Sequence, residues 1–150
     1  MHDQLFDALR KDHKEVRDIF QKMLQTKQSS SREELVGKLH REIMPHMRAE
    51  ERALYPSVRE HCKTCKDDVL ESMEEHHAAR LMLNELQEMD ADDERFHAKA
   101  AVLHEIVEHH LKEEENEIFK DIRKNMSKEE AGDILERFKK EKERVKGQLH

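Results

Sequence analysis

A chain of 150 residues is long enough for one domain with a modest core, and its composition of 42% charged and 35% apolar residues with only three glycines favours amphipathic helices over a sheet. The formal charge of −7 comes from acidic and basic residues mixed along the chain, without a basic stripe that could track phosphates, so we expect no nucleic-acid partner. No apolar run approaches the roughly 20 residues needed to cross a bilayer and the N-terminus lacks the apolar core of a signal peptide, so we expect a cytoplasmic protein without a membrane partner.

Two amphipathic helices are predicted in the first half of the chain. In the first, residues recur at spacings of three and four on one buried face: Phe6, Leu9, His13, Val16, Phe20 and Met23. The run from Gln28 to Ser31 is expected to break this helix, and Ser31 with Glu34 has the spacing of a capping box for the next one. The inner face of that second helix is expected to carry Leu35, Leu39, Ile43, His46, Glu50 and Leu54.

Three further helices are predicted in the second half. The third begins near Asp67 or Asp68, and its inner face is expected to carry Val69, Met73, His76, Ala79, Leu83 and Leu86. After an acidic turn at 90–93, the fourth helix is expected to bury Leu103, Val107, His110, Glu114 and Ile118. Ser127 and Glu130 form a second capping box, which opens a fifth helix with the apolar positions Ile134, Leu135, Phe138 and Val145.

These segments predict an all-α fold, an up-down-up-down four-helix bundle with an additional C-terminal helix. We expect a single domain over residues 1–150, with the bundle over about residues 3–125 and the last helix over about 127–149, packed outside the bundle or against a protein partner. Counting about 1.5 Å per residue from each predicted turn places the histidines of neighbouring helices at similar heights.

The same pattern occurs twice along the chain, a lone histidine on one helix followed by His-x-x-x-Glu on the next. The two copies are separated by 63 residues for the lone histidines and by 64 for the other pairs. Residues four apart lie one above the other on a helix, so each His-Glu pair presents two ligands to one point. Six such groups are costly to bury without a metal, and the repeat therefore predicts a two-metal site formed by His13, His46, Glu50, His76, His110 and Glu114.

On these motifs the sequence resembles the hemerythrin-like domains, also named for their His-His-Glu cation-binding motif. The resemblance covers roughly residues 5 to 123 and is carried by DHKEV around His13, MPHMRAEERALYP from Met44, EEHHAAR around His76 and HLKEEENEIF from His110. It implies a non-haem pair of iron ions bridged by Glu50 and Glu114, with an oxo or hydroxo bridge and with manganese or zinc as substitutes. The ferritin-like carboxylate bundles differ, because they use Glu-x-x-His.

One departure from the oxygen-carrying hemerythrins bears on function. Those proteins have a second histidine four residues after the third-helix ligand, where this chain has Arg80. The resemblance then implies that both irons keep open positions, as in the bacterial di-iron proteins linked to nitric-oxide stress and iron-centre repair. His77 is expected to face the flank of its helix, with a role as a seventh ligand as the alternative. Arg17 and Arg80 are expected to pair with the ligating carboxylates or to lie at the bundle edge.

Three functions remain open at this stage. The first is a di-iron protein that binds or senses dioxygen, nitric oxide or iron, rather than a conventional enzyme. The second is a di-iron enzyme acting on peroxide or nitric oxide, or an iron-centre repair factor. The third is a metal-stabilised helical interaction module with a protein partner on the C-terminal helix.

The remaining candidate residues lie outside this set. His40 and His104 each precede a site histidine by six residues, about 240° around a helix, and are expected off the metal face. Cys62 and Cys65 form CKTC in the loop after the second helix. We expect a reduced pair there, with a redox-switchable disulfide or a metal site with His61 as alternatives.

Overall fold

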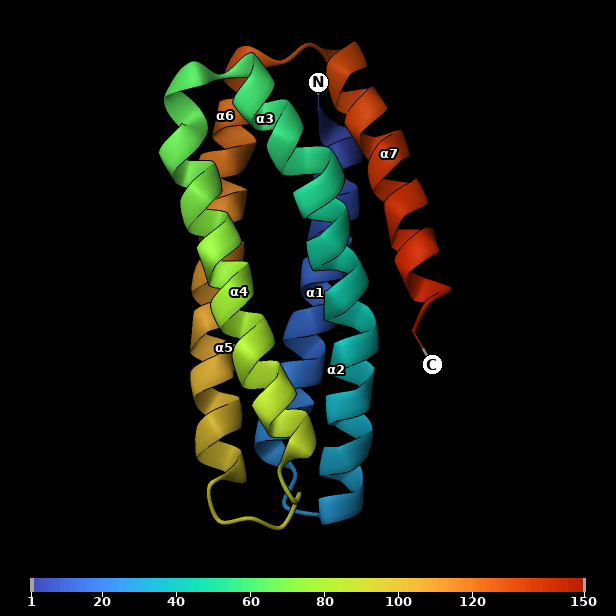
Figure 1. Cartoon of the computed structure of the whole chain (residues 1–150), viewed down its shortest axis with the longest axis vertical. Helices are drawn as coiled ribbons and strands as arrows, with labels where there is room; N and C mark the ends of the chain where they lie inside the picture. Colours follow the sequence, from blue (N-terminus) through green and yellow to red (C-terminus); the bar gives the residue numbers. More distant parts are fainter. Residues whose placement is uncertain (1, 150) are drawn as a thin grey trace.

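The computed structural model describes residues 2–149, which form an all-α structure of four long helical segments and an additional outer helix (Figure 1). The first and third segments are single helices, α1 (Asp3–Gln25) and α4 (Lys66–Glu88). The second segment is composed of α2 (Ser29–Ala49), η1 (Glu50–Leu54) and α3 (Tyr55–His61). The fourth is composed of α5 (Phe96–Glu113), η3 (Glu114–Ile118) and α6 (Phe119–Asn125), and the outer helix is α7 (Lys128–Lys146).

The second and fourth segments each contain a short π-helical turn that the hydrophobic pattern does not predict. The two turns, η1 and η3, begin at Glu50 and Glu114, the two glutamates of the repeated motif. A π-turn adds one residue to a helical turn, and such turns occur frequently at functional sites. In this protein they lie at matching positions in the two halves, and each begins at a glutamate of the motif.

The helix starts agree with prediction at two of three places. α7 opens with the predicted capping box: the Ser127 hydroxyl accepts from the Glu130 amide at 3.1 Å, and the Glu130 carboxylate accepts from the Ser127 amide at 2.7 Å. α4 begins at Lys66, next to the predicted start. The capping box at Ser31 is wrong, because the chain is already helical from Ser29 and the N-cap residue is Gln28, which makes no side-chain cap.

The apolar core forms two clusters. One cluster gathers residues near the ends of the chain and the middle loop, among them Leu5, Leu9, Leu54, Tyr55, Phe119 and Phe138. The other gathers residues toward the opposite end of the bundle, among them Val16, Phe20, Leu39, Leu83, Phe96 and Leu103. The predicted faces are buried with two exceptions: Met73 is 40% exposed and Ser72 takes its inward position, and Leu35 is only partly buried. The buried polar residues of the motif belong to neither cluster.

The outer helix packs against the bundle of its own chain. Figure 1 shows α7 alongside α1 and α2, on the outside of the bundle. Its apolar residues Ile134, Leu135 and Phe138 are buried in the cluster that also holds Leu5 and Leu9 of α1. This confirms the prediction of a helix packed outside the four-helix core. No helix within residues 2–149 is long and apolar enough to span a membrane.

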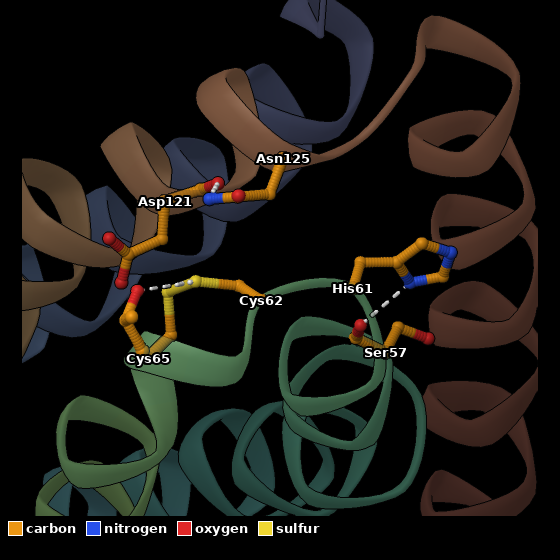
Figure 2. Close-up of a disulfide and its surroundings, with 7 residues drawn as sticks. Ser57, His61, Cys62, Cys65, Asp121 and Asn125 are labelled. Atoms are coloured by element: carbon orange, nitrogen blue, oxygen red, sulfur yellow. Dashed lines mark hydrogen bonds between the residues drawn. A yellow bond between two sulfur atoms is a disulfide. The ribbon is translucent and has the colours of Figure 1, made fainter.

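The CKTC loop lies at one end of the bundle, between α3 and α4, and includes the short 3₁₀ turn η2 (Lys63–Cys65). Figure 2 shows Cys62 and Cys65 joined as a disulfide, with Cα atoms 5.4 Å apart, and Asp121 of α6 among the surrounding residues. The prediction of a reduced pair is therefore wrong for this structure. His61 does not approach the sulfurs as a ligand: its Nδ1 donates to the Ser57 carbonyl, and its Nε2 pairs with Glu130.

Candidate metal centre

The six residues of the repeated motif meet in the interior of the bundle. Four helical segments contribute them, and each side chain is buried, with residue exposures from 0% for His13, Glu50 and Glu114 to 6% for His110. Their nitrogen and oxygen atoms form two groups compact enough to hold a metal ion. The first group contains His13, His46, Glu50 and Glu114, and the second contains Glu50, His76 and His110.

The two glutamates connect the two groups. Oε1 of Glu114 lies 3.1 Å from Nε2 of His13, while its Oε2 lies 3.6 Å from Nε2 of His110. Oε1 of Glu50 lies 3.1 Å from Nε2 of His76, and its Oε2 lies 3.3 Å from Nε2 of His46. Each carboxylate therefore reaches histidines of both halves, which is the placement that a bridging ligand requires.

The inward-facing atoms fit a cation better than they fit one another. The Nε2 atoms of His76 and His110 are only 3.1 Å apart, so without a proton or a metal between them two lone pairs would face each other. Nε2 of His46 and Oε2 of Glu50 are buried and make no hydrogen bond, although they lie close together. Buried polar groups are normally satisfied, and one divalent ion in each of the two groups would satisfy these atoms.

A ring of carboxylates fixes the outward nitrogen of every histidine. Each Nδ1 lies within hydrogen-bond distance of one carboxylate oxygen, and the four pairs with their distances are His13–Glu115 at 2.7 Å, His46–Asp12 at 2.9 Å, His76–Glu51 at 2.7 Å and His110–Glu75 at 2.8 Å. An Nδ1–H that donates to a carboxylate leaves the Nε2 lone pair free and makes it more basic, as metal-ligating histidines require. The tautomer of all four imidazoles is thereby set for coordination from Nε2.

Comparison with known families agrees with this geometry. The family model described as the hemerythrin HHE cation-binding domain matches residues 4–122. The chain belongs to this family. The family is one of cation-binding domains, and the two His and Glu clusters offer groups that could hold a metal ion. α7 begins beyond the matched residues.

One curated relative is a protein named DNA nickase from Nostoc sp. (strain PCC 7120), which is 27% identical over 143 residues. The alignment covers 95% of this chain but 40% of the relative, so the hemerythrin domain accounts for less than half of that protein. No solved structure matches this sequence.

The two arginines do not pair with Glu50 or Glu114. Nη1 of Arg17 lies 3.2 Å from Oε2 of Glu115, and Arg17 also forms an ion pair with Glu108. Arg80 forms an ion pair with Glu51. The arginines therefore contact Glu115 and Glu51, the carboxylates that accept hydrogen bonds from Nδ1 of His13 and His76. Of the two alternatives expected from the sequence, pairing with the ligating carboxylates is wrong.

Tyr55 is a member of the site that sequence reasoning missed. It is 1% exposed, and its hydroxyl donates to Oε2 of Glu114 at 2.7 Å. The same hydroxyl lies 3.3 Å from Nε2 of His76 and 3.4 Å from Nε2 of His110. The 64-residue repeat places Phe119 at the equivalent position, so the second half of the chain has no hydroxyl at this position.

The other missed residues could have been found from the repeat. Asp12 and Glu75 each directly precede a lone histidine of the motif, and Glu51 and Glu115 each directly follow a glutamate of the motif. The two halves therefore share two acidic positions, one at the 63-residue and one at the 64-residue offset, besides the six motif residues. A repeated carboxylate next to a repeated ligand is the signal that the sequence carries for these outer residues.

Burial and hydrogen bonding shift the pKa values of the metal-free site in opposite directions. Burial lowers the pKa of His110, but hydrogen bonds to Glu50 and Glu75 and the charges of Glu114 and Glu50 outweigh it and raise the value to about 10. Burial raises the pKa of Glu51, yet hydrogen bonds from His76 and Arg80 outweigh this and bring it to about 2. Without metal, the His110 imidazole therefore retains its proton at neutral pH, and metal binding to its Nε2 must release it.

Three other candidate histidines lie outside the two metal-binding groups. His77 is exposed, which agrees with the expectation that it faces the flank of α4. The His104 ring packs against Phe20, with centroids 5.1 Å apart, and His40 is half-buried. Neither His40 nor His104 contributes an atom to the clusters.

Proposed function

We propose that this hemerythrin-family protein holds two iron ions and uses them to bind or sense a small diatomic molecule, dioxygen or nitric oxide. His13 and His46 would hold one iron, His76 and His110 the other, and Glu50 and Glu114 would bridge them. Support comes from the two buried clusters that share Glu50 and from the outer carboxylates that fix each imidazole. Mixed imidazole and carboxylate ligands suit iron, with manganese and zinc as substitutes.

The observation that carries this proposal is a cavity of about 20 Å³ beside the ligands. It touches His46, His76 and His110, and its remaining lining is mostly apolar: Val16, Ile43, Met47, Ala79, Val107 and Leu111, with Glu75. Space for one water-sized molecule needs roughly 10–15 Å³ on the same measure, so the cavity takes one very small molecule and no organic substrate. The apolar walls favour a weakly polar gas over water.

Open coordination positions are the second support. The position four residues after His76, where oxygen-carrying hemerythrins have a further histidine, is Arg80. Its guanidinium is engaged with Glu51 and does not approach the cluster as a ligand. The chain would supply two imidazoles and two shared carboxylates to each iron, and a six-coordinate ion would then keep positions for exogenous molecules.

The chemistry of the iron, when bound, is reversible binding of the gas with or without transfer of electrons to it. The chain holds each imidazole in its donor tautomer, keeps bulk water out with the two apolar clusters, and supplies one hydroxyl from Tyr55. The small volume of the cavity limits what can enter by size. Fixed imidazoles, exclusion of water and a size limit are the properties of a site that selects one small ligand.

Titration of anaerobic, reduced protein with nitric oxide tests the proposal. With both irons open, the protein should take up two nitric oxide molecules per chain, and the spectrum should return when the gas is removed. Air should give a reversible spectral change without consumption of a second substrate. Uptake of no gas by protein that contains two irons would overturn the proposal.

The hydroxyl of Tyr55 favours one alternative, an enzyme that reduces peroxide or nitric oxide. Such reactions consume protons, and Tyr55 is a proton-bearing group within 3.4 Å of the inward nitrogens of His76 and His110. Multiple turnovers of hydrogen peroxide by wild-type protein, lost in Tyr55→Phe, would establish the enzyme. A Tyr55→Phe variant with unchanged consumption would exclude this role of the hydroxyl.

We propose no nucleic-acid partner for this domain. The DNA nickase relative is more than twice as long as the shared region, and the formal charge of −7 opposes binding to phosphates.

We propose the cytoplasm as the location. In that compartment a Cys-x-x-Cys pair such as Cys62 and Cys65 is more often redox-active than structural.

A further inference from the structure

The outer helix α7 reaches the metal centre from beyond the residues that the family model matches. Its Phe138 is 1% exposed and packs edge-on against the His46 ring, with centroids 5.5 Å apart. Figure 1 shows α7 along the outside of α1 and α2, the helices that carry His13 and His46. One of the four histidines is therefore in direct contact with an element outside the hemerythrin bundle.

Lys142 of α7 extends this contact into a chain of polar groups. Its Nζ lies 2.8 Å from both carboxylate oxygens of Asp12, and Oδ2 of Asp12 accepts from Nδ1 of His46 at 2.9 Å. The side chains of Lys142 and Asp12 are 17% and 8% exposed, so solvent screens this pair only weakly. The Lys142 ammonium, the Asp12 carboxylate and the His46 imidazole thus form a continuous chain of contacts from α7 to the cluster that contains His46.

The other half of the repeat lacks the ammonium. Glu75 occupies the position equivalent to Asp12, 63 residues later, and accepts from Nδ1 of His110 at 2.8 Å. No lysine or arginine of residues 2–149 forms an ion pair with Glu75, whose further partner is the largely exposed His109 at 3.5 Å. Glu71 and Glu113 lie beside it instead, so the surroundings of Glu75 are acidic.

The repeat also explains why α7 covers one half and not the other. The residues equivalent to Glu71 and Glu113 in the first half are Ala8 and Ala49, at offsets of 63 and 64. Both alanines pack in the apolar cluster that contains Phe138 of α7. The same face is thus small and apolar where α7 docks, and charged where no helix covers it.

Charge on the outer carboxylate controls how strongly an imidazole donates to its metal. A carboxylate that shares its charge with an ammonium attracts the Nδ1 proton less, so the imidazole keeps more N–H character and becomes a weaker donor at Nε2. The ammonium also adds positive charge near the cation. Both effects act on His46 and neither acts on His110.

We propose that Lys142 of α7 is a positioning residue that weakens His46 as a metal ligand through Asp12, so that docking of α7 makes the His46 arm of the centre unlike the His110 arm. The inference rests on the proposed metal centre but not on the identity of the gas. Removal of the ammonium, or displacement of α7, should strengthen the Asp12–His46 hydrogen bond and favour the more highly charged state of the metal.

Nuclear magnetic resonance of the Nδ1 protons in metal-free protein tests the link without iron. The Nδ1 proton of His46 should move downfield in Lys142→Met and stay in place in Lys142→Arg, which keeps the charge. Lys139→Met, an exposed lysine on the same helix, is the matched control, and the His110 proton is the internal reference. An unchanged His46 proton in Lys142→Met, or an equal shift at His110, would overturn the proposal.

Redox titration of the iron-loaded protein measures the consequence. Lys142→Met should change one of the two one-electron equilibria about tenfold in favour of the oxidised state, which corresponds to a potential lower by about 59 mV. Lys142→Arg and Lys139→Met should leave both potentials unchanged. Equal shifts in the Met and Arg variants would contradict the role of the charge. A protein that loads no iron but shows the predicted proton shift would reject the di-iron function and leave the Lys142 link standing.

Discussion

The hydroxyl of Tyr55 donates a hydrogen bond of 2.7 Å to Oε2 of Glu114, a bridging candidate from the opposite half of the chain. The donor begins α3 directly after the π-turn η1, and the acceptor opens the matching turn η3. Both residues are essentially excluded from solvent. This single contact ties the two halves of the repeat together at the level of the metal-binding groups.

Loss of this hydrogen bond should destabilise the metal-free protein. Tyr55→Phe removes the donor and leaves the buried Oε2 of Glu114 less well satisfied, at a cost of roughly 1–3 kcal/mol in the free energy of unfolding. The shape of the ring is retained, and phenylalanine already occupies the equivalent position 119. Urea unfolding of chelator-treated wild-type and variant protein measures the difference, and equal stabilities would show that the contact contributes nothing.

The bridging residues should be separable from nearby histidines by mutation. Glu50→Ala and Glu114→Ala should each lose the metal pair, because each removes a carboxylate that contacts histidines of both halves. His40→Ala and His104→Ala should retain the pair, because neither residue belongs to a cluster. Metal analysis of the four purified variants decides the matter, and equal metal loss in all four would refute the ligand assignment.

Asp121 should make stability depend on pH near the disulfide end of the bundle. Burial, a hydrogen bond with Asp68 and the charge of Asp68 raise the pKa of Asp121 from 3.8 to about 6, and its Oδ2 is buried without a hydrogen-bond partner. A raised carboxyl pKa means that the folded protein disfavours the charged form, so this group lowers stability as the pH rises through that window. Figure 2 shows Asp121 among the residues surrounding Cys62 and Cys65.

Substitution by the neutral amide isolates this effect. Asp121→Asn should be more stable than wild type above pH 6, and its advantage should disappear as the pH falls toward 3.8, where Asp121 is protonated. Urea unfolding at several pH values across this window gives the difference in unfolding free energy. An advantage that is constant with pH would show that the charge of Asp121 is not its cause.

Removal of the metal should lower the melting temperature. The metal-free centre holds four imidazoles and two carboxylates in the interior, and a ligand that binds only the folded state stabilises it by about 4 kcal/mol at a free concentration 1,000 times its Kd. Calorimetry before and after chelation, followed by return of iron, measures the change. A melting temperature that chelation leaves unaltered would mean that these residues stabilise the fold without metal.

Most of the bundle could be predicted because its signals are periodic. The spacing of apolar residues at three and four identified the buried faces, and the repeat at 63 and 64 residues identified six side chains that the structure brings together. The errors at Met73 and Leu35 arise because a neighbouring helix position, one residue away, can turn inward instead. At Ser31 the pattern of a cap was present, but the N-cap of the helix is Gln28, three residues earlier.

Other features depend on tertiary structure and had no sufficient sequence signal. The π-turns at Glu50 and Glu114 follow no change in hydrophobic spacing. The sequence alone indicates only an ordinary core aromatic at Tyr55, and the structure shows that its hydroxyl donates to Glu114. The contact of Lys142 with Asp12 joins residues 130 positions apart, and only the docking of α7 brings them together.

Metal content per chain of protein grown with iron, measured with its absorption spectrum before and after reduction, tests the central claim most directly. Two irons per chain should be found, with oxo-bridge charge-transfer bands that bleach on reduction and return in air. Glu50→Ala serves as the matched control and should lose both the iron and the bands. A folded wild-type protein without stoichiometric metal would contradict the account.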